Sequence, residues 1–277
     1  CGGCPQRETR GGDIVEEVNC QTCHTRQAPL MEGIGLCKRF GRVVALEDVD
    51  VTIRSGEVIG LLGDNGAGKS TLIKILTGVY RPDGGELKFE GRPMDFASPK
   101  DARRLGIETV YQDLALIENM SIARNFFLGA EPSRRIGGLN LLDMTAMRRV
   151  TEEALRDIGI AVRCATDDVC VLSGGERQAI AIGRTMYFGG KLLILDEPTS
   201  ALSVHETNKV LGYIAEARNR GLAVIFITHN LYHVYPVADR FVVLEHGRKV
   251  ADLAKDEATV DDLIGIVAYG IEGTRRQ

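Results

Sequence analysis

A glycine-rich loop between an apolar segment and a helical segment constrains the fold of this chain more than any other feature. Residues Val58–Leu62 are uniformly apolar, as in a strand covered on both faces, and residues 71–77 have helical character. The loop between them fits the pattern G-x-x-x-x-G-K-[ST], and its residues are Gly63, Asp64, Asn65, Gly66, Ala67, Gly68, Lys69 and Ser70. A strand, such a loop and a helix in this order predict a P-loop in an α/β fold.

The composition of this loop matches the needs of a bound triphosphate. Its glycines let the backbone curl so that N–H groups point inward, and the helix that opens at Thr71 adds the partial positive charge of its N-terminus. Lys69 is suited to neutralise the β- and γ-phosphates, and Ser70 offers a hydroxyl oxygen to Mg²⁺. We therefore expect a nucleotide and Mg²⁺ at this loop.

An acidic pair ends a second apolar segment. Residues 192–195 lead into Asp196 and Glu197, and a third apolar segment, Ala223–Ile227, completes the predicted central sheet. In open α/β sheets ligands collect at the carboxyl ends of the strands. Asp196 is suited to hold magnesium, directly or through water, and Glu197 to orient and polarise the water that attacks the γ-phosphate. An acidic pair alone is commonly a solvated strand end, so this interpretation depends on the P-loop.

The remaining pattern indicates two further layers. Residues 49–53 alternate between apolar and polar, and a turn precedes another short strand at 86–89, which predicts an antiparallel edge layer. Residues 114–171 are expected to be mostly helical. Within them a helix capped at Thr145 has apolar residues at helical spacing, namely Met147, Val150, Ala154 and Ile158.

Composition excludes several classes of protein. The formal net charge of -4 and pI of about 5.8, with no visible basic patch, predict no nucleic-acid partner. The longest apolar runs fall far short of the roughly 20 residues of a membrane span, and no secretory signal is visible. Seven cysteines, an odd count, argue against a disulfide framework. We expect a cytoplasmic protein.

Two further motifs supply a resemblance to a family. Leu172 is followed by Ser173, Gly174, Gly175 and Glu176 just before a helix, and His229 follows the segment Ala223–Ile227. With these motifs the chain resembles the ABC ATPases, in which the signature loop binds the γ-phosphate held by the opposite subunit. Such a loop is a second helix N-terminus with glycines and a hydroxyl, although a serine N-cap alone would also explain it. One chain cannot easily bring both loops to the same phosphate, so the resemblance implies a head-to-tail, two-fold dimer.

The resemblance assigns three more residues. Gln112 matches the glutamine that touches magnesium and the attacking water, His229 matches the switch histidine that contacts the γ-phosphate, and Phe40 resembles the aromatic that stacks on the adenine of ATP. It implies a P-loop NTPase core over residues 29–262, with an antiparallel β subdomain and a helical subdomain inserted at about 114–175, and a tail at 263–277. The chain departs from the family at Ser203, where many members have Asp.

Within the family the chain resembles the ATPases of ribose- and fructose-type sugar importers, in the segments 38–41, 43–46 and 120–129. This likeness implies an ATPase subunit at the cytoplasmic face of the inner membrane, working as a homodimer on a membrane permease that receives sugar from a periplasmic or extracellular binding protein. Soluble ABC ATPases that act on ribosomes or DNA are the alternative. The chain shows neither the tandem domains with a basic linker nor the long coiled coil of those proteins.

The first 28 residues are polar and glycine-rich, and we expect them to form an appendage. They contain Cys1, Cys4, Cys20 and Cys23, whose spacing matches a four-thiolate zinc ribbon. The resembled family has no such element, so a zinc site and an appendage without metal both stay open.

Overall fold

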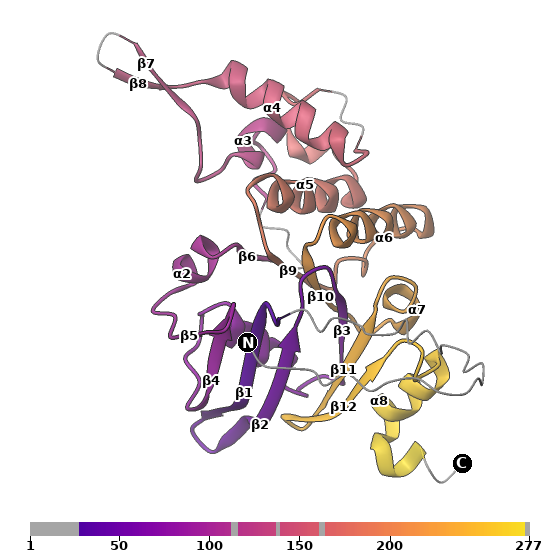
Figure 1. Cartoon of the computed structure of the whole chain (residues 1–277). Coiled ribbons are helices and arrows are strands. Elements are labelled where there is room, and N and C mark those ends of the chain that lie inside the picture. Colours follow the sequence, from indigo (N-terminus) through magenta and orange to yellow (C-terminus); the bar gives the residue numbers. More distant parts are fainter. Residues whose placement is uncertain (1–27, 112–115, 137–138, 161–163, 275–277) are drawn as a thin grey trace, which may run out of the picture.

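The computed structural model describes residues 28–111, 116–136, 139–160 and 164–274 (Figure 1). At its centre is a six-stranded sheet in the order β12-β11-β3-β10-β9-β6, in which β12 runs antiparallel to β11 and all other neighbouring strands are parallel. The strands are β3 (Val58–Leu62), β6 (Ile107–Val110), β9 (Leu192–Asp196), β10 (Ala223–Ile227), β11 (Arg240–Glu245) and β12 (Arg248–Ala254). The three apolar segments of the sequence are therefore central strands, as predicted.

The central strands are buried on both faces. In β10, Ala223, Ile225 and Ile227 belong to one hydrophobic cluster. Val224 and Phe226 belong to a second cluster on the opposite face. Alternate side chains of a strand point to opposite faces, so a strand covered on both sides must be apolar throughout.

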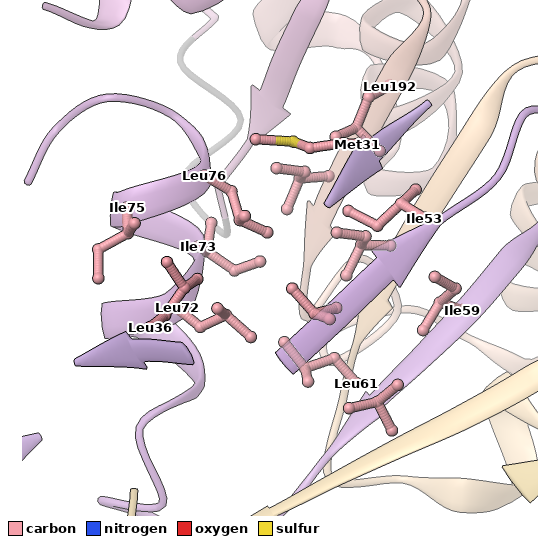
Figure 2. Packing of buried hydrophobic residues seen from close by; sticks show 14 of the residues in the cluster. Met31, Leu36, Ile53, Ile59, Leu61, Leu72, Ile73, Ile75, Leu76 and Leu192 are labelled. Carbon is pink, nitrogen blue, oxygen red and sulfur yellow. The ribbon is translucent and has the colours of Figure 1, made fainter. Parts of the chain in front are cut away.

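A second, antiparallel sheet packs beside the first. It consists of β1 (Met31–Phe40), β2 (Val43–Ile53), β4 (Gly84–Phe89) and β5 (Arg92–Met94), in the order β2-β1-β4-β5, which confirms the predicted edge layer. Helix α1 (Lys69–Leu76) supplies four buried residues, Leu72, Ile73, Ile75 and Leu76, to the cluster between the two sheets. Figure 2 shows Leu72, Ile73 and Leu76 on the side of the helix that faces Met31, Leu36 and Ile53, whereas Ile75 points to the other side. The helix that follows the P-loop is thus fixed by the hydrophobic core.

A helical lobe stands at one end of the core (Figure 1) and contains α3 (Ile122–Phe126), α4 (Met144–Asp157) and α5 (Gly174–Tyr187). The segment is less helical than predicted, because strands β7 (Ser133–Ile136) and β8 (Leu139–Leu142) form a hairpin that projects from the lobe. The predicted cap at Thr145 is also wrong. Asp143 caps α4 instead, since its carboxylate accepts the N–H of Ala146 at 2.9 Å.

The other helices complete the layers. They are α2 (Pro99–Arg104), α6 (Val204–Asn219), α7 (Leu231–Val234) and α8 (Val260–Thr274), with a 3-10 turn at Val169–Val171. The expected tail boundary at residue 263 falls inside α8, and Leu263 is fully buried in the core. Among the residues described above, no helix has the length and apolar content that crossing a bilayer requires.

Candidate functional site

The P-loop follows strand β3 and is held in a conformation that requires glycine. Gly63 has φ 141°, and a Cβ there would lie 2.3 Å from the carbonyl oxygen of Leu244. Gly68 has φ 105°, and its Cβ would lie 2.7 Å from the carbonyl oxygen of Ala45. Gly66 has φ 82° and faces open space. Gly63 and Gly68 therefore let the loop lie against neighbouring backbone oxygens, and Gly66 allows a positive φ where the loop faces open space.

Lys69, the first residue of α1, turns its ammonium back over the loop. Its Nζ donates to the carbonyl oxygens of Gly63 at 2.7 Å and Asp64 at 3.0 Å. Burial lowers the pKa of Lys69, and the charges of Glu197, Asp64 and Asp196 oppose that shift. The structure thus brings the P-loop lysine and the acidic pair together, although they are more than 120 residues apart in the sequence.

Asp196, the last residue of β9, lies in surroundings that favour a cation. Burial raises its pKa first, the negative charge of Glu197 raises it further, and Lys69 acts in the opposite direction. A bound cation would relieve both effects on the ionised carboxylate. The Asp196 carboxylate and the exposed Ser70 hydroxyl are the hard oxygen ligands that Mg²⁺ prefers, so these residues fit a magnesium ion.

Glu197 has the left-handed backbone, with φ 51°, which is uncommon for a residue other than glycine. Its Oε1 accepts the backbone N–H of His229 at 2.9 Å and lies 2.8 Å from His229 Nδ1. The hydroxyl of Thr228 donates to Oε2 at 3.1 Å. Residues after β10 therefore orient the carboxylate after β9, because these two strands are parallel neighbours that end together. A strained backbone held by several contacts is typical of a functional residue.

Sequence reasoning missed the residues that hold this carboxylate. Thr228 and Thr199 are both 1% exposed, and they bond to Glu197 and to His233 respectively. Asn230 caps helix α7 and bonds to His233 as well. Their positions beside His229 and Glu197 were the only signal, since a single Thr or Asn near a motif has no distinctive pattern.

The signature loop begins helix α5. Ser173 is its N-cap, and the side chains of Ser173 and Glu176 each accept a backbone N–H of the other residue. A Cβ on Gly175 would lie 3.1 Å from the Cβ of Glu206, so this glycine lets α5 approach α6. Packing between helices thus accounts for Gly175 independently of any phosphate.

Glu206, which was not among the residues predicted from the sequence, connects the signature loop to the segment after Glu197. Its carboxylate accepts hydrogen bonds from the N–H of Ser203 at 3.1 Å and from the hydroxyl of Ser203 at 2.8 Å. Ser203 is the N-cap of α6. Hydrogen bonds from the side chain and backbone of Ser203, then from the Ser173 hydroxyl and the Gly175 N–H, lower the pKa of Glu206 to about 2. Ser203, where many family members have Asp, therefore acts as a capping residue here. The pattern S-x-x-E would have revealed the capping box.

Phe40 lies at the end of β1 and is 42% exposed. Its ring meets Tyr80 edge-on, with centroids 5.2 Å apart, and the Lys38 ammonium is 5.7 Å from its centroid. An exposed aromatic face supported from the side could stack on a base. Gln112, like the four N-terminal cysteines, lies outside the described residues.

Two groups of residues thus stand on one chain. The P-loop, Asp196, Glu197 and His229 meet at the carboxyl edge of the parallel sheet, and the signature loop lies at the start of α5 with contacts to α6. A P-loop core with an antiparallel sheet and an inserted helical lobe is the architecture of an ATP-binding cassette. The ABC transporter family model matches residues 46–200, more than half of the chain, so the chain belongs to this family.

Relatives match over most of the chain. It is 42% identical over 253 residues to the fructose import ATP-binding protein FrcA of Rhizobium meliloti, covering 90% of this chain and 97% of that protein. It is 45% identical over 238 residues to the xylose/arabinose import ATP-binding protein XylG of Sulfolobus acidocaldarius, covering 86% and 93%. The ribose import ATP-binding protein RbsA 1 of Rubrobacter xylanophilus is 44% identical over 235 residues, and the chain spans only 46% of its length.

Solved structures confirm the fold. The cbiO1 protein of Clostridium perfringens, part of the ABC transporter complex cbiONQ, matches with a TM-score of 0.72 and 25% identity over 90% of this chain and 99% of its own. A bacterial ABC transporter cassette solved as a dimer matches with a TM-score of 0.67 and 21% identity over 81% and 98%. The predicted fold class, with its antiparallel and helical subdomains, is therefore confirmed.

Proposed function

We propose that this chain is the ATP-hydrolysing subunit of an ABC importer for a monosaccharide and that it energises a separate membrane permease. The observation that carries the proposal is the meeting of Lys69, Asp196 and Glu197 at one edge of the sheet. The names of the relatives, which import fructose, xylose, arabinose or ribose, support a monosaccharide as the solute. The chain would then act at the cytoplasmic face of the membrane as a peripheral subunit.

The P-loop residues would bind the triphosphate of ATP. The curled loop and the N-terminus of α1 direct N–H groups at phosphate oxygens, and the Lys69 ammonium would move from its own loop's carbonyls to the β- and γ-phosphates. Ser70, Asp196 and Gln112 would hold Mg²⁺, which supplies positive charge to the phosphate oxygens during transfer. Phe40 would stack on the adenine, with Tyr80 beside it.

Glu197 and His229 would carry the hydrolytic step. The Glu197 carboxylate orients the attacking water and accepts hydrogen bonds from Thr228 and His229 that hold it in place. The His229 side chain is 77% exposed, so its ring could contact the γ-phosphate without breaking the backbone N–H bond to Glu197. Hydrolysis would follow from the positioning of water and from charge stabilisation, without a covalent intermediate.

A complete site requires a second copy of the chain. The Ser173 hydroxyl and the N-terminus of α5 form an anion-binding group that contacts α6 of its own chain. In a head-to-tail dimer the signature loop of each copy would close over the γ-phosphate of the other, giving two competent sites. A bacterial cassette of similar fold has been solved as a dimer.

The permease would dock in a groove between the core and the helical lobe. This cavity of about 350 Å³ is lined by residues of both parts, among them Arg103, Arg104, Glu108, Arg184 and Phe188. Burial lowers the pKa of Arg184, the charges of Glu108 and Glu131 oppose that shift, and the guanidinium donates to the carbonyl oxygen of Leu128 at 2.6 Å. Arg103 is paired with Glu108 and Arg104 with Asp101. A groove with these arginines, Arg184 and an aromatic ring fits a partly apolar cytoplasmic segment with an acidic residue.

ATP turnover and oligomeric state test the proposal. We expect the Glu197→Gln variant to lose turnover by about 100-fold or more and to form a stable dimer with ATP, because bound ATP then persists. We expect the wild-type chain to turn over ATP faster in complex with its permease. Arg104→Glu should reduce that stimulation more than the control Arg92→Glu, because Arg92 lies on the outer strand β5. A Glu197→Gln variant that stays monomeric with ATP, even beside the permease, would refute the dimer mechanism.

A further inference from the structure

A chain of hydrogen bonds runs from Glu197 through Thr228, Asn230 and both ring nitrogens of His233 to Thr199, and the peptide chain from Glu197 to Thr199 closes it into a ring. Thr228 donates to Glu197 Oε2 at 3.1 Å, and the N–H of Asn230 donates to the Thr228 hydroxyl oxygen at 3.0 Å. The side chain of Asn230 then meets His233 Nε2 at 3.1 Å. His233 Nδ1 lies 2.9 Å from the hydroxyl oxygen of Thr199, which is buried in the turn after Glu197.

The turn itself closes the ring. Both the N–H and the hydroxyl of Ser200 bond to the main-chain oxygen of Glu197, at 3.3 and 3.2 Å. The segment from Glu197 to Ser200 is therefore a compact unit, and Thr199 is its bond to α7. Through this ring the carboxylate of Glu197 and the turn that follows it are attached to the same short helix.

The hydrogen atoms of this ring can be assigned from the backbone. The N–H of Tyr232 donates to Asn230 Oδ1 at 3.1 Å, and a backbone N–H can only donate, so the amide NH₂ of Asn230 must face His233. His233 Nε2 then accepts, which requires a neutral imidazole with its proton on Nδ1. The Nδ1–H group of His233 then donates a hydrogen bond to the hydroxyl oxygen of Thr199.

We propose that His233 is a positioning residue for ATP hydrolysis, in which its neutral imidazole ties the turn after Glu197 to helix α7. This inference rests on the proposed role of Glu197 as the residue that orients water. The bonds of Thr228 and His229 fix the carboxylate, and the bond of His233 to Thr199 fixes the strained backbone from which that carboxylate extends. His233 acts through these contacts and does not itself need to meet ATP.

The test is steady-state ATP turnover of the full chain with three substitutions of His233. The His233→Leu variant loses two hydrogen bonds, and we expect kcat to fall about 30-fold while KM for ATP changes by less than about twofold. In His233→Asn the side-chain amide can keep the bond to Thr199, and in His233→Gln it can keep the bond to Asn230. Each of these should lose about fivefold in kcat.

A double-mutant cycle of His233→Leu and Thr199→Val separates the proposed hydrogen bond between these residues from a general loss of packing. If His233 acts through Thr199, the double variant His233→Leu/Thr199→Val is no slower than His233→Leu alone. Thr207→Val removes a buried hydroxyl that has no bonding partner in the described structure. In the double variant His233→Leu/Thr207→Val the decrease in kcat should equal the product of the two single decreases. Multiplying effects with Thr199→Val would overturn the proposal.

The outcomes also distinguish this inference from the proposed function. A wild-type chain without ATPase activity, or Glu197→Gln with full activity, would refute the proposed function. Normal wild-type activity with a strong Glu197→Gln defect, but His233→Leu within twofold of wild-type kcat, would overturn the role of His233 alone. If His233→Leu does not fold by circular dichroism, the Asn and Gln variants decide, and kcat within 1.5-fold of wild type in both would overturn the proposal.

Discussion

Removal of one hydroxyl group, in Thr228→Val, tests whether the Glu197 carboxylate must be held for hydrolysis. Valine has nearly the shape of threonine, and Thr228 is 1% exposed, so the core should keep its packing. Oε2 of Glu197 would lose the bond from Thr228, and no other donor to this oxygen exists in the described part of the chain. The backbone N–H of Asn230 would also lose the Thr228 hydroxyl oxygen as its acceptor. Oε1 would keep both of its contacts with His229.

The size of the effect follows from the type of bond. A hydrogen bond to a charged group contributes about 1.5–3 kcal/mol. The Glu197 side chain is 20% exposed, so solvent can partly replace the lost donor and we take the lower end, about 1.5 kcal/mol. This corresponds to about a tenfold decrease in kcat, because about 1.4 kcal/mol is a factor of ten in rate. KM for ATP should stay within about twofold, since the P-loop is unchanged.

The assay is steady-state release of phosphate by the purified full chain at saturating ATP, with urea unfolding as a check on stability. Thr207→Val is the matched control, because its hydroxyl is buried and has no partner among the described residues. We expect the control to keep kcat within twofold. If Thr228→Val also stays within twofold while Glu197→Gln loses 100-fold or more, the Thr228 bond does not orient the carboxylate.

Three further predictions concern stability and the P-loop. The pKa of Glu206 is about 2, below its ordinary 4.5, so the stability that its carboxylate contributes is fully present above pH 4.5 and is lost as the pH falls towards 2. The difference in urea midpoint between wild type and Glu206→Gln should therefore shrink over that range, and a constant difference would contradict this prediction. Arg240 is 12% exposed and paired with Glu57, so Arg240→Met should cost about 3 kcal/mol in urea unfolding, and adding Glu57→Gln should restore part of it. Gly63→Ala forces backbone strain of about 1–3 kcal/mol, so ATP affinity by calorimetry should fall at least about tenfold, and unchanged affinity would contradict the geometry.

The sequence predicted the central fold well because its signals are strong and local. A strand buried on both faces must be uniformly apolar, and Val58–Leu62 and Ala223–Ile227 matched strands β3 and β10 at both ends. The P-loop glycines were equally readable, since Gly63 and Gly68 have conformations and contacts that other residues cannot adopt. These elements were predictable because each position has one physical requirement.

The errors arose where local signals compete. The β7–β8 hairpin lies in a segment interpreted as helical, and its exposed residues, such as Leu139 and Leu141, lack the alternating pattern that marks a half-buried strand. At the start of α4, Asp143 and Thr145 are both good caps, and backbone geometry selects Asp143.

The contacts of the candidate site were the least predictable part. Thr199 bonds to His233 and Thr228 bonds to Glu197, so both hydrogen bonds join the segment after β9 to the segment after β10. The pairing of β9 with β10 brings these loops together, and single-residue patterns do not carry that information. The motif residues could be found from sequence, whereas the residues that orient them required the structure.

The contact of Gly175 with Glu206 has a consequence for the timing of hydrolysis. This contact and the capping of α6 by Ser203 join the signature loop to the loop that begins at Glu197. In a dimer, the first of these loops would serve the neighbour's ATP and the second would serve the chain's own. A movement of the loop at one ATP site would then move the loop at the other ATP site through the contacts of Glu206, and the two ATP sites would be linked by a coupling free energy. We therefore expect turnover to rise with ATP concentration more steeply than for independent sites, with a Hill coefficient above one.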